Sequence, residues 1–439
     1  MSDPVASFLH EAVWHGSLQP AEEILSAHPE VASASIHAAA VLGDDSTVER
    51  FIQLDKNNAT VNAPPYDTNA LVYLCMSKYL RLDESRTPRF LRAAAALLDA
   101  GADANSGFWT TGKHPEFETA LYGAAGIAHH VEMTRLLLER GADPNDDEAA
   151  YHSPETYENG AMQLLVETGK LTPENLVMML LRKHDWHDYD GQKYLLEHGA
   201  DPNRKWKNGW RPMHHALARD NRIETIELLL EHGADPTLKD DGESAVATAA
   251  HRGRRDVLEL FETRGIPIQL SNADELIAAC AKNDSTAVRA LAREEWTGVD
   301  EIMTNSGQLI VEFAGNGNTD GVRQLIDIGI GVNSQFVKGD GYWDLAPKAT
   351  ALHNAAWRLR HDTVRFLVER GANVNAKDGK GRTPLMLAVR ASVDSYWTRL
   401  RSPESVDVLL NAGASLDGVQ FPSGYSEIDE LLQSVTDTR

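Results

Sequence analysis

The residues best suited to binding a metal ion lie in one short segment, 183–190. It holds His184, His187 and three aspartates, and imidazoles and carboxylates in that number could ligate zinc or manganese. Counting back from Gly199, where a leucine-rich helix ends, places this segment in a turn between two helices. No further ligand recurs at an established metal-binding spacing. We therefore expect a solvated helix–helix turn here, and we predict neither a metal nor a cofactor.

Motifs that mark a catalytic site are lacking from the sequence. We find no glycine-rich phosphate loop after a predicted strand, no nucleophile elbow, no His-Glu-x-x-His helix and no paired Cys/His set. The two cysteines, Cys75 and Cys280, each lie in an apolar helical pattern, which excludes a disulfide framework and a cysteine-based zinc site. We predict no catalytic residue, although an active site assembled from distant segments would escape a motif search.

The elements that would position any site follow from a repeated phrase, Gly-Ala-Asp-x-Asn, which comes each time after a leucine-rich helix end. Glycine supplies the left-handed residue that ends a helix, and Asp or Asn opens the next turn. Gly199 and Gly233 are 34 residues apart, and Gly233 and Gly265 are 32 apart. Copies and close variants of the phrase begin at Gly101, Gly141, Gly199, Gly233 and Gly371.

A second phrase lies upstream of these endings, at residues 118–125, 211–216, 350–356 and 381–388. It resembles the Thr-Pro-Leu-His-x-Ala start of an ankyrin repeat, whose period is about 33 residues. Thr caps the first helix, Pro takes its first position, and small Ala residues let neighbouring helices approach closely. His353 stands at the consensus His, which in this family hydrogen-bonds between adjacent turns.

The resemblance implies an all-α fold, a solenoid of stacked helix-turn-helix units joined by hairpin finger loops. It covers nearly the whole chain as about twelve repeats, several of them degenerate and some with insertions. We assign residues 1–415 to the repeat array and residues 416–439 to a C-terminal capping helix and tail.

In ankyrin repeats the fingers and first helices form a concave recognition face, and several fingers here are rich in aromatic residues. Large aromatic rings are costly to leave on a loop unless something covers them. The cover is either a partner or a neighbouring finger, and both explanations remain open. Residues next to the consensus His on the first helices should also look into the groove. The predicted partner-binding residues are Trp109, Trp206, Trp210, His215, Tyr342, Trp343, Asn354 and Trp357.

The formal net charge of −23, from 65 acidic and 42 basic side chains, opposes binding to phosphate backbones and anionic lipids. We therefore expect neither a nucleic-acid nor a membrane partner. The charge is explained either by solubility of an elongated molecule or by attraction to a protein with a basic surface. Because the sequence has no signal-like start and few cysteines, we expect the protein in the cytoplasm. We also expect a monomer.

These observations lead to one predicted function and one alternative. The predicted function is a non-catalytic scaffold that binds a macromolecule in a concave groove lined by aromatic fingers. The alternative is an enzyme with a small-molecule pocket built between the large finger insertions. A deep pocket with converging carboxylates or histidines would favour the enzyme, and a shallow open groove would favour the scaffold.

Overall fold

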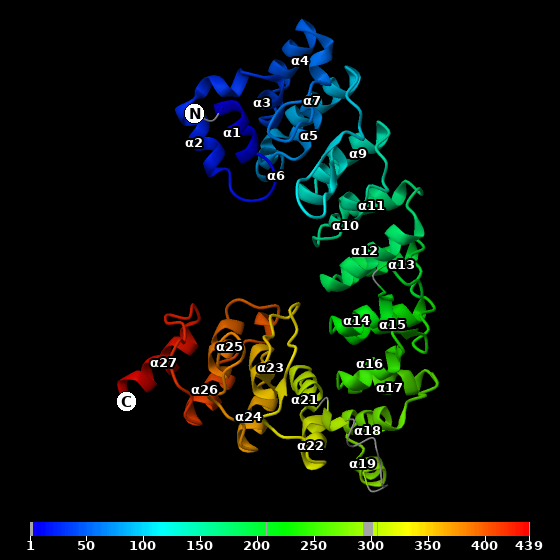
Figure 1. Cartoon of the computed structure of the whole chain (residues 1–439), viewed down its shortest axis with the longest axis vertical. Coiled ribbons are helices and arrows are strands. Elements are labelled where there is room, and N and C mark those ends of the chain that lie inside the picture. The colour runs from blue at the N-terminus through cyan, green and yellow to red at the C-terminus, as the bar shows by residue number, and fades with distance from the viewer. Residues whose placement is uncertain (1–2, 208, 293–301, 305, 439) are drawn as a thin grey trace. The chain divides into compact units, whose positions relative to one another are not determined.

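A computed structural model describes residues 3–207, 209–292, 302–304 and 306–438. The chain forms two compact units, residues 1–234 and 235–439, and each is a series of short antiparallel helix pairs (Figure 1). Within each unit the first helices of successive pairs pack on one another, as α3 does on α5 and α23 does on α25. The prediction of an all-α solenoid with hairpin fingers is confirmed.

The first unit contains fifteen α-helices and one finger hairpin among its described residues. Short 3-10 helices at Pro29–Ser33, Lys56–Ala59 and Glu84–Arg86 and a π-helix at Gly123–Ile127 lie between them. The bounds are α1 Pro4–Glu11, α2 Gln19–Ala27, α3 Ile36–Val41, α4 Asp45–Leu54, α5 Ala70–Cys75, α6 Lys78–Leu82, α7 Thr87–Asp99, β1 Gly107–Trp109, β2 Phe117–Thr119, α8 Ala120–Tyr122, α9 Val131–Glu139, α10 Asp147–His152, α11 Gly160–Glu167, α12 Pro173–Asp185, α13 Tyr189–Glu197, α14 Pro212–Ala218 and α15 Ile223–Glu231.

The second unit repeats the same design, and its described residues include two further finger hairpins, β3–β4 and β5–β6. Its bounds are β3 Lys239–Asp240, β4 Glu243–Ser244, α16 Ala245–His251, α17 Arg255–Thr263, α18 Asn272–Ala281, α19 Ser285–Leu291, α21 Ser306–Gly315, α22 Thr319–Asp327, β5 Gln335–Phe336, β6 Ala349–Thr350, α23 Ala351–Trp357, α24 His361–Glu369, α25 Pro384–Ala391, a 3-10 turn at Thr398–Leu400, α26 Glu404–Asn411 and α27 Ser426–Thr438.

The repeated phrases act locally as their residue types predict. Thr119 and Thr383 cap α8 and α25 by accepting hydrogen bonds from the backbone amides of Tyr122 and Met386. Gly199 adopts a positive φ of 96°, which ends α13. His353 Nε2 bonds the Arg382 carbonyl oxygen at 3.1 Å, which confirms that the consensus His links adjacent turns.

The asparagine that closes the Gly-Ala-Asp-x-Asn phrase joins one repeat to the next. The Asn105 Oδ1 atom accepts from the Asp143 amide at 2.8 Å, and its amide nitrogen donates to the Gly141 carbonyl at 3.1 Å. Asn375 makes the equivalent pair of bonds with Ser415 and Gly413. The repeated Asn therefore satisfies polar backbone groups in the following finger, which explains why the phrase keeps it.

The prediction of a solvated turn over residues 183–190 is wrong for residues 183–185, which belong to α12, and for Asp188, which is buried. α12 runs on to Asp185, and the side chains of Lys183 and His184 are fully buried. The Lys183 ammonium donates to Asp188 Oδ2 at 2.7 Å and to the Thr156 carbonyl at 2.6 Å. Packing against the preceding repeat, which the local sequence does not reveal, covers this segment.

Candidate functional site

An open pocket of about 450 Å³ lies in the first unit between two fingers, the β1–β2 hairpin and the loop that precedes α14. Its floor comes from α10 and α12. We call it the acidic pocket, and its lining consists of the carboxylates Glu116, Asp147 and Glu148, the rings Tyr151 and Trp206, the cations His152 and Lys207, and Asn175 and Met178.

The finger loop that carries Trp206 has a defined conformation. The Trp206 amide donates to the Trp210 carbonyl at 2.9 Å, and the Gly209 amide donates back to the Trp206 carbonyl at 2.8 Å. Arg204 at the start of the loop pairs with Glu174 on α12. This tight turn holds the half-buried indole of Trp206 at the pocket, while the ring of Trp210 is 41% exposed.

His152 on the floor of the acidic pocket is held between two carboxylates, Glu148 of the lining and Glu155 beyond the end of α10. Its Nδ1 lies 2.8 Å from Glu155 Oε2, and its Nε2 lies 3.4 Å from Glu148 Oε2. Burial acts to lower the pKa of His152, but the hydrogen bonds to both carboxylates outweigh burial and raise the pKa to about 9. The imidazolium therefore stays charged at neutral pH, and both nitrogens are already engaged.

Beside this lining is a carboxylate that sequence reasoning did not single out, Glu118 on β2. The residue is only 4% exposed, and among the described residues its Oε2 has no hydrogen-bond partner. Burial, followed by the negative charges of Glu148 and Glu116, raises the pKa of Glu118 to about 7. Nothing in the local sequence marks Glu118, because its burial depends on the repeat that follows.

A chain of ion pairs continues from the acidic pocket into the next repeat. Glu155 pairs with Arg182, whose Nη1 lies 2.5 Å from Asp185 Oδ2. Asp185 also contacts His215 at 3.2 Å and Arg219 at 2.5 Å. Burial opposes the charge of Asp185, but His215 and Arg219 hold its pKa well below the usual range. These ion pairs between half-buried side chains and the buried His215 link the packed first helices.

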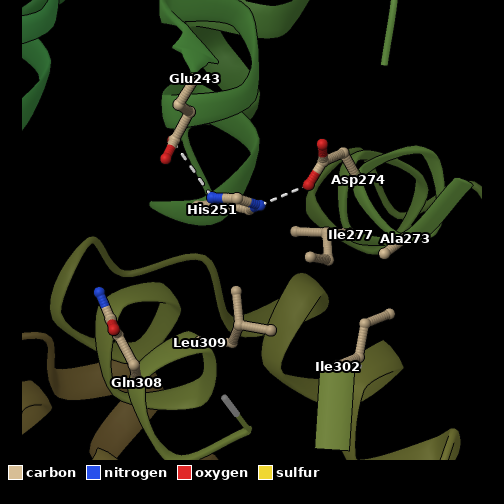
Figure 2. A pocket seen from close by; sticks show the side chains of 8 residues that line it. All are labelled: Glu243, His251, Ala273, Asp274, Ile277, Ile302, Gln308 and Leu309. Carbon is tan, nitrogen blue, oxygen red and sulfur yellow. Dashed lines mark hydrogen bonds and ion pairs between the residues drawn. The ribbon is translucent and has the colours of Figure 1, made fainter. Parts of the chain in front are cut away.

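A second, smaller pocket of about 250 Å³ lies in the second unit. Figure 2 shows the His251 imidazole between Glu243 and Asp274, with Ile277 and Leu309 facing the space beneath it. The Nδ1 atom is 3.2 Å from Glu243 Oε1, and Nε2 is 2.6 Å from Asp274 Oδ1. Burial lowers the pKa of His251, but the two carboxylates raise it to about 9. This clamp ties α16 to α18.

Two further observations concern metal ions and membranes. Among the described residues, no three His, Cys, Asp or Glu side chains are placed to hold a metal ion together. In the same part of the chain, no helix combines the length and apolar character needed to cross a membrane.

Comparison with known protein families decides what these repeats are. The profile described as Ankyrin repeats (3 copies) matches residues 157–240, 177–272 and 337–418. The profile described as Ankyrin repeat matches residues 117–148, and together the matches cover more than half of the sequence. The chain belongs to the ankyrin-repeat family. Ankyrin repeats generally mediate protein–protein interaction, whereas the count of about twelve stays a prediction.

Individual relatives share only a short part of this ankyrin-repeat chain. Human Rabankyrin-5 is 45% identical over 69 residues, which is 15% of this chain and 6% of that protein. Serine/threonine-protein kinase 12 of Arabidopsis thaliana is 35% identical over 85 residues, 19% of this chain and 17% of the kinase. The solved ankyrin repeat domain of Bcl-3 aligns with 22% identity and a TM-score of 0.25, covering 53% of this chain and 97% of that one.

In this ankyrin-repeat chain some of the predicted partner-binding residues are exposed to solvent and others are buried. Trp109 is 66% exposed and Tyr342 39%, and both lie on finger loops as predicted. The expectation that His215, Asn354 and Trp357 look into an open groove is wrong, because each is at most 5% exposed. His215 is bound to Asp185, and Asn354 donates to the Val311 carbonyl at 2.9 Å.

Trp343 is likewise not an exposed anchor, since it is only 7% exposed. It packs with Trp397, whose ring centroid is 4.7 Å away, and its carbonyl accepts from Trp357 Nε1 at 2.6 Å. The Arg358 guanidinium lies over both Trp343 and Trp397, at 4.9 and 5.1 Å. In this finger the protein itself covers the ring of Trp343, while Tyr342 stays exposed. Of the predicted partner-binding residues, Trp206 is the one that lines the acidic pocket.

Proposed function

We propose that this ankyrin-repeat chain is a protein-binding scaffold whose partner contacts the finger surface of the first unit. We define the finger surface as Trp109, Phe117, Trp206 and Trp210 together with the acidic pocket. The observation that carries the proposal is the exposure of Trp109, 66%, at the end of a hairpin where its ring lies 5.1 Å from that of Phe117. Aromatic residues held in place and left uncovered are typical binding anchors.

Both fingers of this surface are preorganised for binding. The β1–β2 pairing places Trp109 opposite Phe117, and the turn through Trp206 and Trp210 is closed by two backbone hydrogen bonds. Ordering a loop costs free energy when a partner binds, so loops that are already ordered leave more of the contact energy as affinity. The carboxylates between these fingers favour a partner that presents a basic surface.

The geometry supports the scaffold better than the enzyme. His152, the pocket's best candidate for a general base, carries a proton at neutral pH and has both nitrogens bonded to carboxylates. The pocket is also open between two fingers, and reacting groups would stay in water there.

The proposal is tested with a library of random peptides displayed on phage and selected against the wild-type protein. Selected peptides are then titrated against Trp109→Ala/Trp206→Ala. We expect this double variant to lose about 2 kcal/mol of binding free energy, roughly thirtyfold in affinity, because anchor residues contribute on that scale.

Phe421→Ala serves as the matched control, since Phe421 is 57% exposed and lies in the second unit. Its affinity for the same peptides should equal that of the wild type. If Trp206→Ala unfolds the first unit, the exposed pair Trp109→Ala and Trp210→Ala replaces it. Peptides that bind the Trp variants and the wild type equally would contradict the proposal.

A further inference from the structure

We infer that the second unit carries a further interaction surface, which binds an acidic segment of a partner protein through a lysine and an arginine set beside two tyrosines. We call it the tyrosine surface and define it as Tyr342, Lys380, Arg390 and Tyr396. The inference goes beyond the proposed function, because that function concerns the first unit, and either one can fail without the other.

Two successive repeats of the second unit are longer than the ankyrin period. The left-handed glycines that follow their second helices, Gly329, Gly371 and Gly413, are 42 residues apart, against about 33 in an ordinary repeat. Extra residues lie in the loop 337–348 between β5 and β6 and in the turn 392–403 between α25 and α26. Long loops in a compact repeat are typically functional.

The two insertions meet at Trp343. The centroid of its ring lies 4.7 Å from that of Trp397, 5.9 Å from that of Tyr396 and 4.6 Å from that of Tyr342. Both tryptophans are buried, whereas Tyr342 is 39% exposed and Tyr396 is 44% exposed. The buried tryptophans therefore form a base that holds two tyrosine rings at the surface.

The loop 337–348 is ordered by backbone hydrogen bonds. Asp340 and Leu345 exchange a pair of them, each of 2.8 Å. The Gly379 amide of the next finger donates to the Pro347 carbonyl at 2.6 Å. A partner that binds here meets a loop which is already in place, so less free energy is lost to ordering it.

The charge of this region is opposite in sign to that of the whole chain. Residues 337–348 and 373–403 hold eight Lys or Arg against four Asp and no Glu, whereas the chain has 42 basic and 65 acidic side chains. The side chain of Lys380 is 59% exposed and that of Arg390 is 45% exposed. Complementary charge favours an acidic partner at this surface.

An internal carboxylate shows that these cations suit a carboxylate. Asp344 pairs with Lys380, and its Oδ2 lies 2.8 Å from Arg382 Nη1 and 2.7 Å from Arg390 Nη1. Burial opposes the charge of Asp344, but the three cations lower its pKa to about 2. Arg382 also pairs with Asp378, so Lys380 and Arg390 carry the positive charge that remains for a partner.

The observations favour a protein over a nucleic acid at this surface. Bases stack on exposed ring faces, and Trp343, Trp357 and Trp397 are each at most 7% exposed. The net charge of −23 opposes a long polyanion. A short acidic segment meets mainly the local field, because salt screens charges beyond about 8 Å. Ankyrin repeats also generally mediate protein–protein interaction.

The experiment measures the fluorescence anisotropy of a labelled peptide of alternating glycine and glutamate with the full chain, at an ionic strength of about 0.15 M. A peptide of alternating glycine and glutamine is the neutral reference, and single-stranded oligothymidylate is the polyanion. We expect the glutamate peptide to bind, to bind more weakly as salt is added, and to bind more tightly than the other two probes. Absence of its binding, or tighter binding of oligothymidylate, would overturn the inference.

Lys380→Gln/Arg390→Gln should bind the glutamate peptide about tenfold more weakly than the wild type, since each exposed ion pair contributes modestly. Lys239→Gln/Arg289→Gln is the matched control, because it removes the same two charges from exposed positions on β3 and α19 of the same unit. The control should lose less than about twofold. Equal losses in the two double variants would show unspecific attraction and refute the tyrosine surface.

Two further variants separate binding from folding, which circular dichroism follows for each. Asp344→Asn should bind the glutamate peptide about threefold more tightly, because it removes the internal competitor for Lys380 and Arg390. Asparagine tolerates the positive φ of 52° at this position, and unfolding cannot produce a gain in affinity. Tyr342→Ala/Tyr396→Ala should bind about fivefold more weakly. A folded Asp344→Asn that binds more weakly, or tyrosine variants that bind like the wild type, would contradict the inference.

Discussion

Replacing Glu118 with glutamine should stabilise the first unit at neutral pH. The carboxyl's ordinary pKa of 4.5 is raised to about 7 in the folded protein. The folded state therefore holds this proton more tightly than the unfolded state, and stability falls as pH rises from about 4.5 to about 7. Glutamine keeps the shape of the side chain and carries no charge, so it removes this loss.

The magnitude follows from the two pKa values. Ionising Glu118 costs about 3 kcal/mol of unfolding free energy at pH 7 and less than about 1 kcal/mol at pH 5. Relaxation around the amide reduces the recoverable part, so we expect Glu118→Gln to gain about 1 to 3 kcal/mol at pH 7.5. For a unit of this size that gain is about 2 to 12 °C in melting temperature.

The assay is thermal unfolding followed by circular dichroism at pH 5 and pH 7.5, for the wild type, Glu118→Gln and Glu49→Gln. The gain should be present at pH 7.5, small at pH 5, and absent from Glu49→Gln, whose carboxylate is exposed on α4. A Glu118→Gln variant that melts with the wild type at pH 7.5, or that melts lower at both pH values, would refute the assignment of a buried, destabilising carboxylate.

Three further predictions concern side chains whose roles the structure defines. Trp343→Ala should cost about 3 to 5 kcal/mol of unfolding free energy, because the Trp343 ring is buried against Trp397. Trp109→Ala should change the unfolding free energy by less than about 0.5 kcal/mol, because Trp109 is exposed. Urea titration of both variants measures the two values. Lys183→Met should cost about 3 kcal/mol by leaving Asp188 buried without its cation, and a second change, Asp188→Asn, should recover much of that loss in the same titration. His251, with its pKa raised to about 9, should make the second unit lose about 1 to 2 kcal/mol between pH 6.5 and pH 9, and urea titrations of His251→Gln should show no such loss.

Local features of the chain could be predicted because their causes lie within a few residues. A left-handed glycine after a leucine-rich helix, a threonine cap and a small-residue first helix each depend on neighbours in sequence. From them the all-α repeat architecture, the finger hairpins and the link made by His353 were predicted, and the structure confirms all three. The fingers that carry exposed rings at Trp109 and Tyr342 were also found in this way.

Exposure and ionisation could not be predicted, because they depend on which repeat packs against which. Two fingers with similar aromatic content differ in the solvent exposure of their tryptophan rings. Trp343 lies under Arg358 and Trp397, whereas Trp109 is left uncovered. The sequence predicts that His184 lies in a polar turn, yet the neighbouring repeat buries its side chain. Thus the sequence by itself determined the structure of the single repeat and the loops between successive repeats. Only the tertiary structure decided which rings stay in water and which carboxylate, Glu118, loses its solvation, because burial is set by contacts between segments far apart along the chain.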